Sequence, residues 1–154
     1  MPQFTITRRL PFRAADLYAI AADVASYPHF VPLCAGARVW DESTDADGRR
    51  YFRAAIDIAY PKLRLAETLT SEVTADPVAL AVRSVSRQAP AKLVDNRWLF
   101  HGLPAGGTDV EFHLAYELSS RMLQLLVSGM FDYAARKIIN AFEARAHELY
   151  RPVR

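Results

Sequence analysis

Cysteine, lysine and long apolar runs are scarce in this sequence of 154 residues. Cys34 is its one cysteine, so the chain cannot form an internal disulfide, and no Cys-rich tract predicts a structural zinc site. No segment reaches the roughly 18 apolar residues expected of a membrane span. The first residues show no charged region followed by an apolar stretch, so we expect no secretory signal. These absences favour a cytoplasmic protein, and peripheral contact with the inner membrane stays open.

An excess of one sign of charge is also missing, because the net charge is +2 and 23% of the residues are charged. This balance gives no case for a DNA partner. Hydrophobic residues make up 51% of the chain, which is ample for a buried core at this length. No Ser/Gly-rich linker, charge run or internal repeat divides the sequence, so we expect a single domain over residues 1–154.

Residues 27–34, YPHFVPLC, combine two prolines with several large apolar side chains. Each proline fixes its own φ, lacks an amide donor and biases the preceding residue toward extended geometry, so the segment is predicted to be a short turn or loop. Loops usually lie on the surface, where their backbone polar groups meet water. An apolar, proline-stiffened loop therefore indicates that the loop covers an apolar region of the protein beneath it.

Apolar residues repeat with two different periods along the chain. Alternation predicts strands at residues 4–10, 37–43, 51–60, 62–75, 78–85, 91–103 and 109–118. Helical spacing predicts helices at residues 13–25 and 120–149, with Ser119 or Ser120 as the N-cap of the second. Strands joined by short turns favour an antiparallel meander whose apolar face needs a cover. The predicted fold class is α+β: a curved antiparallel sheet of six to seven strands wrapped around a long C-terminal helix, with a short helical segment after the first strand.

This architecture commonly leaves a hollow between sheet and helix, and residues 27–34 would lie at its opening. Large side chains on the inner sheet face oppose small residues of the last helix, Gly129, Ala134 and Ala141. Small residues opposite large ones can leave space for a ligand, or they can permit close packing of an ordinary core. The candidate ligand-binding residues are Phe30, Val31, Phe52, Ile56, Glu67, Asn96, Trp98, Phe100, Phe112, Leu114, Tyr116, Val127, Met130 and Ala134.

Two polar residues fall on the inner face in this pattern. Glu67 alternates with Leu65 and Leu69, and Asn96 alternates with Val94 and Trp98. An isolated buried charge is costly, so Glu67 should have a partner, shift its pKa or reach a polar ligand group. A bulge or a water-satisfied pair in the core explains both residues equally well.

The remaining reactive residue types predict no chemistry. The four histidines, His29, His101, His113 and His147, do not form a metal-ligand spacing, and we predict neither a metal site nor a catalytic residue. Cys34 has no evident base or cation beside it, which favours a small buried hydrophobe over a nucleophile.

The first half of the last helix, residues 121–131, is apolar on more than one side. Contact with the short helix or with a second copy would explain this pattern. A membrane-facing rim around the opening of the hollow would explain it too, with Arg121 placed for anionic headgroups. The sequence leaves these alternatives open.

Several motifs in order resemble one family. They are YPHFVPLC (27–34), LAETLTSEV (65–73), KLVDNRWLF (92–100), VEFHLAYEL (110–118) and AFEARAHELY (141–150). Together they resemble the coenzyme Q-binding protein and RatA-like family of the START-like, polyketide cyclase/dehydrase superfamily. Two departures remove bulk: Leu33 stands where many relatives have tryptophan, and residues 89–91 replace a Gly-Pro-aromatic run.

The resemblance implies a helix-grip (START/Bet v 1-like) fold that binds ubiquinone or a similar lipid without transforming it, in support of respiratory electron transport. No cofactor would be required, and ubiquinone would be the bound ligand. It also implies two alternatives. One is a toxin that acts on the large ribosomal subunit, for which Arg8, Arg9, Arg49, Arg50 and Arg53 are the candidate contacts. The other is a cyclase or dehydrase in which Glu67, with Asn96 or Tyr116, supplies the base and the hydrogen-bond donor.

Overall fold

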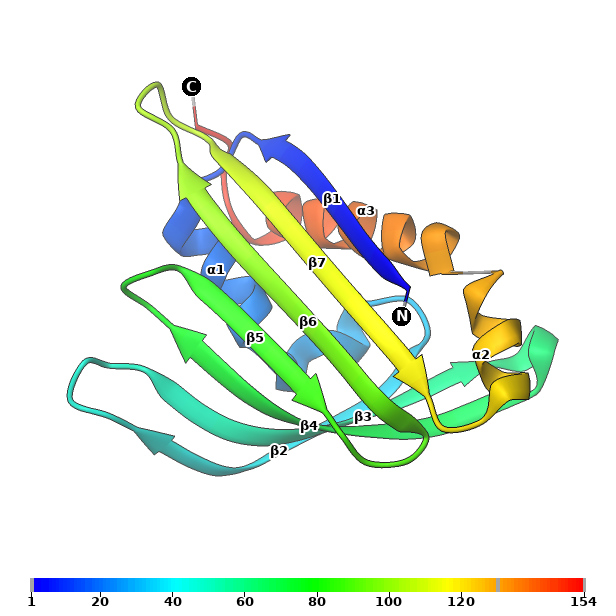
Figure 1. The fold of residues 1–154 in the computed structure, drawn as a ribbon. Helices are drawn as coiled ribbons and strands as arrows, with labels where there is room; N and C mark the ends of the chain where they lie inside the picture. Colours follow the sequence, from blue (N-terminus) through cyan, green and yellow to red (C-terminus); the bar gives the residue numbers. More distant parts are fainter. Residues whose placement is uncertain (1, 130, 154) are drawn as a thin grey trace.

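The computed structural model describes residues 2–129 and 131–153, and within them one antiparallel sheet of seven strands wraps over a helix (Figure 1). The strands are β1 (Gln3–Leu10), β2 (Cys34–Thr44), β3 (Arg50–Tyr60), β4 (Leu65–Asp76), β5 (Ala81–Ser86), β6 (Ala91–Gly102) and β7 (Thr108–Leu118). Their order is β1-β7-β6-β5-β4-β3-β2, so six strands form a meander and the first strand pairs with the last. The predicted α+β architecture is confirmed.

The helical elements are α1 (Ala14–Ala22), η1 (Val24–His29), η2 (Pro61–Leu63), α2 (Arg121–Ser128) and α3 (Phe131–Leu149). Figure 1 shows α3 running across the concave side of the sheet, while α2 turns away from it toward the β3–β4 end. The prediction of one helix over residues 120–149 is therefore wrong. Gly129, a poor helix former, directly follows α2, and the break separates two helices with different axes. Ser120 is the N-cap of α2, since its side chain accepts a hydrogen bond from the Leu123 amide.

The proline-rich segment, residues 27–34, consists of parts that differ in backbone conformation. Residues 27–29 finish the 3-10 helix η1, which tolerates Pro28, and residues 30–33 form the turn that leads into β2. The prediction of a short turn or loop holds for the second part only. A 3-10 turn is short enough to fit between α1 and the loop, where a longer α-helix would meet the proline.

The core lies between the inner sheet face and one stripe of α3. This stripe consists of Ala135, Ile139, Phe142 and Ala146, all buried at i, i+4, i+7 and i+11. Tyr150 is partly buried and takes the next place against the core, whereas Leu149 is 49% exposed. Leu149 falls one position off the stripe, which explains its exposure.

Candidate ligand-binding cavity

A cavity of about 290 Å³ lies between the concave sheet face and the helices α2 and α3. The sheet side is lined from β3, β4, β5, β6 and β7, and the other side from η1, the turn after it, α2 and α3. Inward-pointing residues alternate along each strand, and this alternation places a row of apolar side chains in the wall. The volume is large enough for part of a lipid.

Aromatic rings close the inner end of the cavity. The Trp98 ring lies 4.6 Å from the Phe112 ring and 4.6 Å from the Phe142 ring, measured between centroids. All three residues are buried and line the cavity. Phe142 comes from α3, so this cluster also holds the helix against the sheet.

Two predicted lining residues belong to the packed core instead. Phe52 and Phe100 are each 3% exposed and lie outside the lining of the cavity. Phe100 stacks behind Trp98, with centroids 6.0 Å apart. Both residues point inward as predicted, but they lie beyond the aromatic wall, where the sheet packs directly on α1 and α3. The prediction that they contact ligand is corrected accordingly.

The other end of the cavity is more exposed, and we call it the mouth. It is formed by the turn at residues 30–33 and Cys34, by Tyr60, Leu65 and Glu67, and by Leu123 and Val127 of α2. None of these residues is buried, whereas the aromatic wall is. The apolar turn of the proline-rich segment therefore covers part of a cavity.

Phe30 is the largest side chain of this turn that lines the cavity. Its ring packs edge-on against Tyr27 at 5.8 Å, and the Arg145 guanidinium lies over it at 5.4 Å. Tyr27 is itself fixed, because its hydroxyl donates to the Ala21 carbonyl oxygen and burial raises its pKa. The turn is thus held from the helix side, and Phe30 is placed at the mouth.

The backbone around Leu33 and Cys34 departs from regular strand geometry. Leu33 has a φ of 68°, which is costly for a residue with a branched side chain, and it lines the cavity. The register between β2 and β3 shifts between Cys34 and Gly36. Burial raises the pKa of the Cys34 thiol, which donates to the Gly36 carbonyl oxygen at 3.5 Å. A neutral thiol is a weak nucleophile and suits an apolar lining.

Glu67 lies at the mouth. It lines the cavity, as alternation predicts, but it is exposed and forms no hydrogen bond or ion pair with the described residues. The expectation that Glu67 is buried is wrong, because β4 extends past the wall at this point and the side chain is exposed. Contact of Glu67 with a polar ligand group stays a prediction. Asn96, further inside, is half-buried and lines the cavity.

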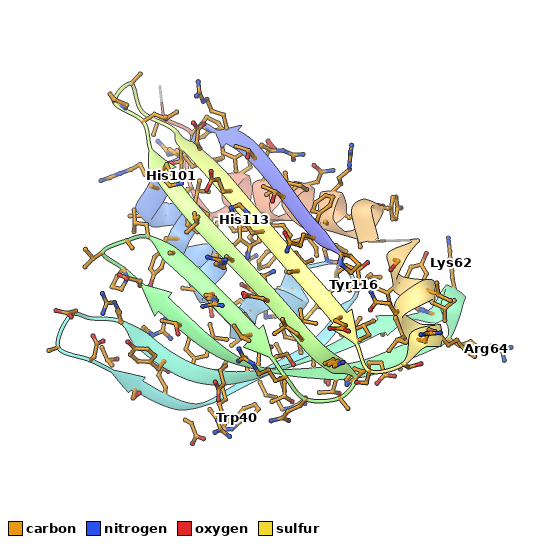
Figure 2. The ribbon with its side chains drawn as sticks, viewed as in Figure 1. Trp40, Lys62, Arg64, His101, His113 and Tyr116 are labelled. Carbon is orange, nitrogen blue, oxygen red and sulfur yellow. The ribbon has the colours of Figure 1, made fainter. Side chains whose placement is uncertain are left out.

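Tyr116 is buried on β7, near the end that faces α2 (Figure 2). Its hydroxyl donates to Ser128 Oγ at 3.1 Å. This bond links the sheet to the end of α2 across the side of the cavity.

Eleven of the candidate residues are brought together in the lining. They are Phe30, Val31, Ile56, Glu67, Asn96, Trp98, Phe112, Leu114, Tyr116, Val127 and Ala134. Met130 lies outside the described residues. Contact of the eleven with a ligand stays a prediction.

Other lining residues were missed by the sequence reasoning. Among them are Tyr27, Leu33, Cys34, Ile58, Leu69, Ser71, Ser84, Val94, Leu123, Ile138 and Phe142. Alternation alone could have found Ile58, Leu69, Ser71 and Val94, since they share the inner face of the sheet with the candidate ligand-binding residues. Ser84 gave no signal of its own, because a serine in a short strand is equally common on either face.

The outer surface of α2 is apolar. Met122 is 74% exposed, Leu125 is 72% exposed and Leu126 is 44% exposed. Lys62 and Arg64 extend from the β3–β4 turn at the same end of the molecule (Figure 2). Residues flanking that turn and residues of α2 both line the mouth, so the apolar surface and the cations belong to segments that border the same opening.

A membrane-spanning helix and a metal-binding cluster are both absent from residues 2–129 and 131–153, the part of the chain that the structure describes. In this part of the chain no helix is both long and apolar enough to span a bilayer. The same residues contain no group of three or more His, Cys, Asp and Glu side chains arranged to hold a metal ion.

The family model for polyketide cyclase/dehydrase and lipid transport proteins matches residues 10–143, which is most of the chain. The protein belongs to this family. The sequence is 30% identical over 150 residues to the ribosome association toxin RatA of Escherichia coli K12, covering 97% of this chain and 90% of that one. It is 24% identical over 144 residues to the mitochondrial coenzyme Q-binding protein of Schizosaccharomyces pombe, covering 93% and 85%. The resemblance found in the sequence motifs is confirmed.

Solved structures agree on the fold. An 18 kDa protein from Caulobacter crescentus superposes with a TM-score of 0.80 at 30% identity, covering 97% of this chain and 98% of that one. A START superfamily protein from Mycobacterium smegmatis gives 0.77 at 18% identity, with coverage of 96% and 98%. The ZhuI aromatase/cyclase from Streptomyces sp. R1128 gives 0.76 at 14% identity, with coverage of 95% and 93%. The last two likenesses concern the fold alone, and the START-like helix-grip fold is confirmed.

Proposed function

We propose that this protein binds a hydrophobic lipid of the ubiquinone class in its cavity and carries it without chemical change. The observation that carries the proposal is the cavity of about 290 Å³, with an almost wholly apolar lining, an aromatic wall at one end and a mouth at the other. Cavities of this kind suit apolar ligands that a few polar groups orient. The similarity to a protein named for coenzyme Q binding supports the quinone class. Such a carrier would support respiratory electron transport.

A catalytic role has less support. The candidate base, Glu67, is exposed at the mouth and has no hydrogen-bond partner among the described residues. The hydroxyl of Tyr116 is engaged with Ser128. General acid-base catalysis needs positioned groups within hydrogen-bond reach of each other or of substrate, and a general base is usually held by a third group. We therefore favour a binding protein.

The two tryptophans provide a direct test. Trp98 forms part of the cavity wall, whereas Trp40 is 38% exposed on β2 (Figure 2). In the Trp40→Phe variant, titration with a short-chain ubiquinone should give a saturable loss of Trp98 fluorescence, because a quinone in the cavity lies close to the ring.

The reciprocal variant, Trp98→Phe, is the control. Its remaining Trp40 should lose fluorescence only weakly and without saturation. Equal, non-saturating quenching of both variants would contradict lipid binding in the cavity, as would a lack of lipid in the solvent extract of natively purified protein.

The lipid would be exchanged with a bilayer through the mouth. Exposed methionine and leucine side chains on α2 form an apolar surface beside it, and burial of this surface in a bilayer is favourable. Lys62, Arg64 and Arg121 are exposed and have no ion-pair partner among the described residues. Unpaired cations beside an apolar surface match anionic phospholipid, with each contributing about 1 kcal/mol near a charged leaflet. We therefore assign this surface to a bilayer and not to a second copy.

The double variant Met122→Asp with Leu125→Asp should bind vesicles containing anionic phospholipid at least about tenfold more weakly than the unaltered protein. The reason is that two exposed apolar side chains are replaced by carboxylates that the leaflet repels. Vesicle co-sedimentation measures the effect. Val78→Asp is the matched control, since Val78 is 80% exposed on the β4–β5 turn, away from the mouth. Equal loss in both, or a concentration-dependent dimer that the double variant abolishes, would refute the bilayer assignment.

A second candidate function is association with the large ribosomal subunit, which the similarity to RatA favours. The charges of the candidate arginines are partly neutralised, because each has a carboxylate oxygen within 4 Å. The pairs are Arg8–Glu143 (3.5 Å), Arg9–Asp109 (2.8 Å), Arg49–Asp76 (3.1 Å), Arg50–Glu42 (2.7 Å) and Arg53–Asp41 (3.9 Å). RNA phosphates would have to displace these partners. A salt-sensitive shift of the protein into the large-subunit fraction of a sucrose gradient would favour this function.

A further inference from the structure

Three polar side chains interrupt the apolar wall of the cavity at one place. Ser84 of β5 and Asn96 of β6 are paired residues of adjacent strands, and Ser84 is also paired with Val73 of β4. Ser71 is two residues before Val73 on the same face, so it lies diagonally from Ser84. Directly opposite residues have Cβ atoms about 4.5–5.5 Å apart, and diagonal neighbours lie about 7–8 Å apart. All three side chains line the cavity.

These groups have no partners within the described protein. The side chains of Ser71, Ser84 and Asn96 form no hydrogen bond with the described residues, although Ser71 is only 5% exposed. Ser86, two residues after Ser84 on β5, is 1% exposed and its hydroxyl oxygen has no hydrogen-bond partner in the described part of the chain, but it lies outside the cavity lining. Buried polar groups are normally satisfied, and leaving them unsatisfied is costly. The three side chains that face the cavity can therefore supply hydrogen bonds to a polar ligand group placed there.

The charge of the lining restricts that ligand further. Among the described lining residues, Glu67 is the one with a formal charge, and it lies at the mouth. No arginine, lysine or histidine lines the cavity in this part of the chain. A buried carboxylate or phosphate would therefore lack a cation, and an isolated buried charge is strongly unfavourable. Binding of a fatty acid or phospholipid with its charged headgroup inside is disfavoured on this ground.

We infer that Ser71, Ser84 and Asn96 form a subsite for a neutral ring rich in oxygen, so that the ligand enters ring-first and its apolar tail leaves through the mouth. This inference rests on the proposed function and deepens it. An asparagine amide offers two donors, and each serine hydroxyl offers one, which suits a ring with several carbonyl and ether oxygens. The apolar residues between the subsite and the mouth, Ile58, Leu69 and Leu118, would contact the tail.

The subsite is adjacent to the aromatic wall. Asn96 and Trp98 are two residues apart on the same face of β6, about 7 Å along the strand. A ring held by Asn96 would therefore contact the Trp98 indole. A ligand bound the other way round would place its ring at the mouth and its tail against the indole.

The test uses Asn96→Leu, which keeps the side-chain volume and removes the amide, in a Trp40→Phe background. The probes are decylubiquinone, decylbenzene and dodecanoate, whose affinities are measured by displacement of Nile red. The parent should bind decylubiquinone at least about tenfold more tightly than decylbenzene, and dodecanoate more weakly than either. Asn96→Leu should weaken decylubiquinone binding about tenfold, the effect of one or two lost hydrogen bonds, and leave decylbenzene affinity within about twofold. The quinone should also quench Trp98 less completely at saturation in this variant.

Two further measurements separate a binding role from a structural one. The ligand-free Asn96→Leu protein should melt at the same temperature as the parent or higher, because an unpartnered amide has been replaced by an apolar group. Thr74→Val, a polar-to-apolar change outside the cavity lining, should leave both affinities unchanged. Equal loss of both neutral probes in Asn96→Leu, unchanged quinone affinity, or dodecanoate binding as tight as quinone binding would overturn the subsite. If the parent binds no probe, the proposed function fails, and the subsite fails with it.

Discussion

Replacement of Trp98 with alanine is expected to lower the free energy of unfolding by about 3–5 kcal/mol. The Trp98 ring centroid lies 4.6 Å from the ring centroids of Phe112 and Phe142, and the indole stacks on Phe100. It therefore joins the sheet to α3. Its removal takes away these ring contacts and extends an existing cavity into the wall. Domains of this size are stable by only about 5–15 kcal/mol, so the loss would be a large share of the total.

Urea unfolding followed by circular dichroism measures this effect at equilibrium. Trp40→Ala is the matched control, because Trp40 is 38% exposed and its loss should cost less than about 1 kcal/mol. A cost below about 1 kcal/mol for Trp98→Ala would mean that the wall does not hold α3 on the sheet. The ligand-binding assay on the folded fraction should show weaker quinone binding as well, since the wall borders the proposed subsite.

Much of the fold could be predicted from periodicity. Strict alternation over β7, where Val110, Phe112, Leu114 and Tyr116 are all buried, leaves one register against the core, because a slip by one residue would expose every one of them. Turn residues then place the strands in a meander. The helical break at Gly129 was missed, because the apolar repeat continues on both sides of it and a single glycine costs only about 1 kcal/mol.

The site was less accessible to sequence reasoning, because alternation gives the face of a strand and not the depth along it. Phe52 and Phe100 share the face of Ile56 and Trp98, yet they lie in the packed core beyond the wall. Glu67 shares the face of Leu69, yet it lies in water at the mouth. How deep in the cavity a residue lies depends on where the helices end against the sheet. Only when these helix ends are known can Ser71 and Ser84 be recognised as cavity-lining residues.

Truncation of Phe30 to alanine is expected to speed quinone release about tenfold while lowering stability by only about 1 kcal/mol. Phe30 is half-buried at the mouth, where its ring contacts Tyr27 and Arg145 and faces the cavity. Burial of an aromatic ring against ligand contributes roughly 1.5 kcal/mol or more, which is about a tenfold change in a rate limited by opening. Pro32 within the turn and Pro28 in η1 just before it limit the conformations of the open turn, so closing it costs little entropy.

Phe100→Ala is the matched control, since it removes the same kind of ring from a core position. Phe100 is 3% exposed and lies outside the cavity lining. It should cost about 3–5 kcal/mol of stability and leave the off-rate of the folded protein within about twofold. Stopped-flow displacement of quinone and thermal melting on both variants separate retention from packing. If Phe30→Ala showed the large stability loss with an unaltered off-rate, the proline-stiffened turn would be core and not a cover, and ligand would have to leave the cavity beside α2.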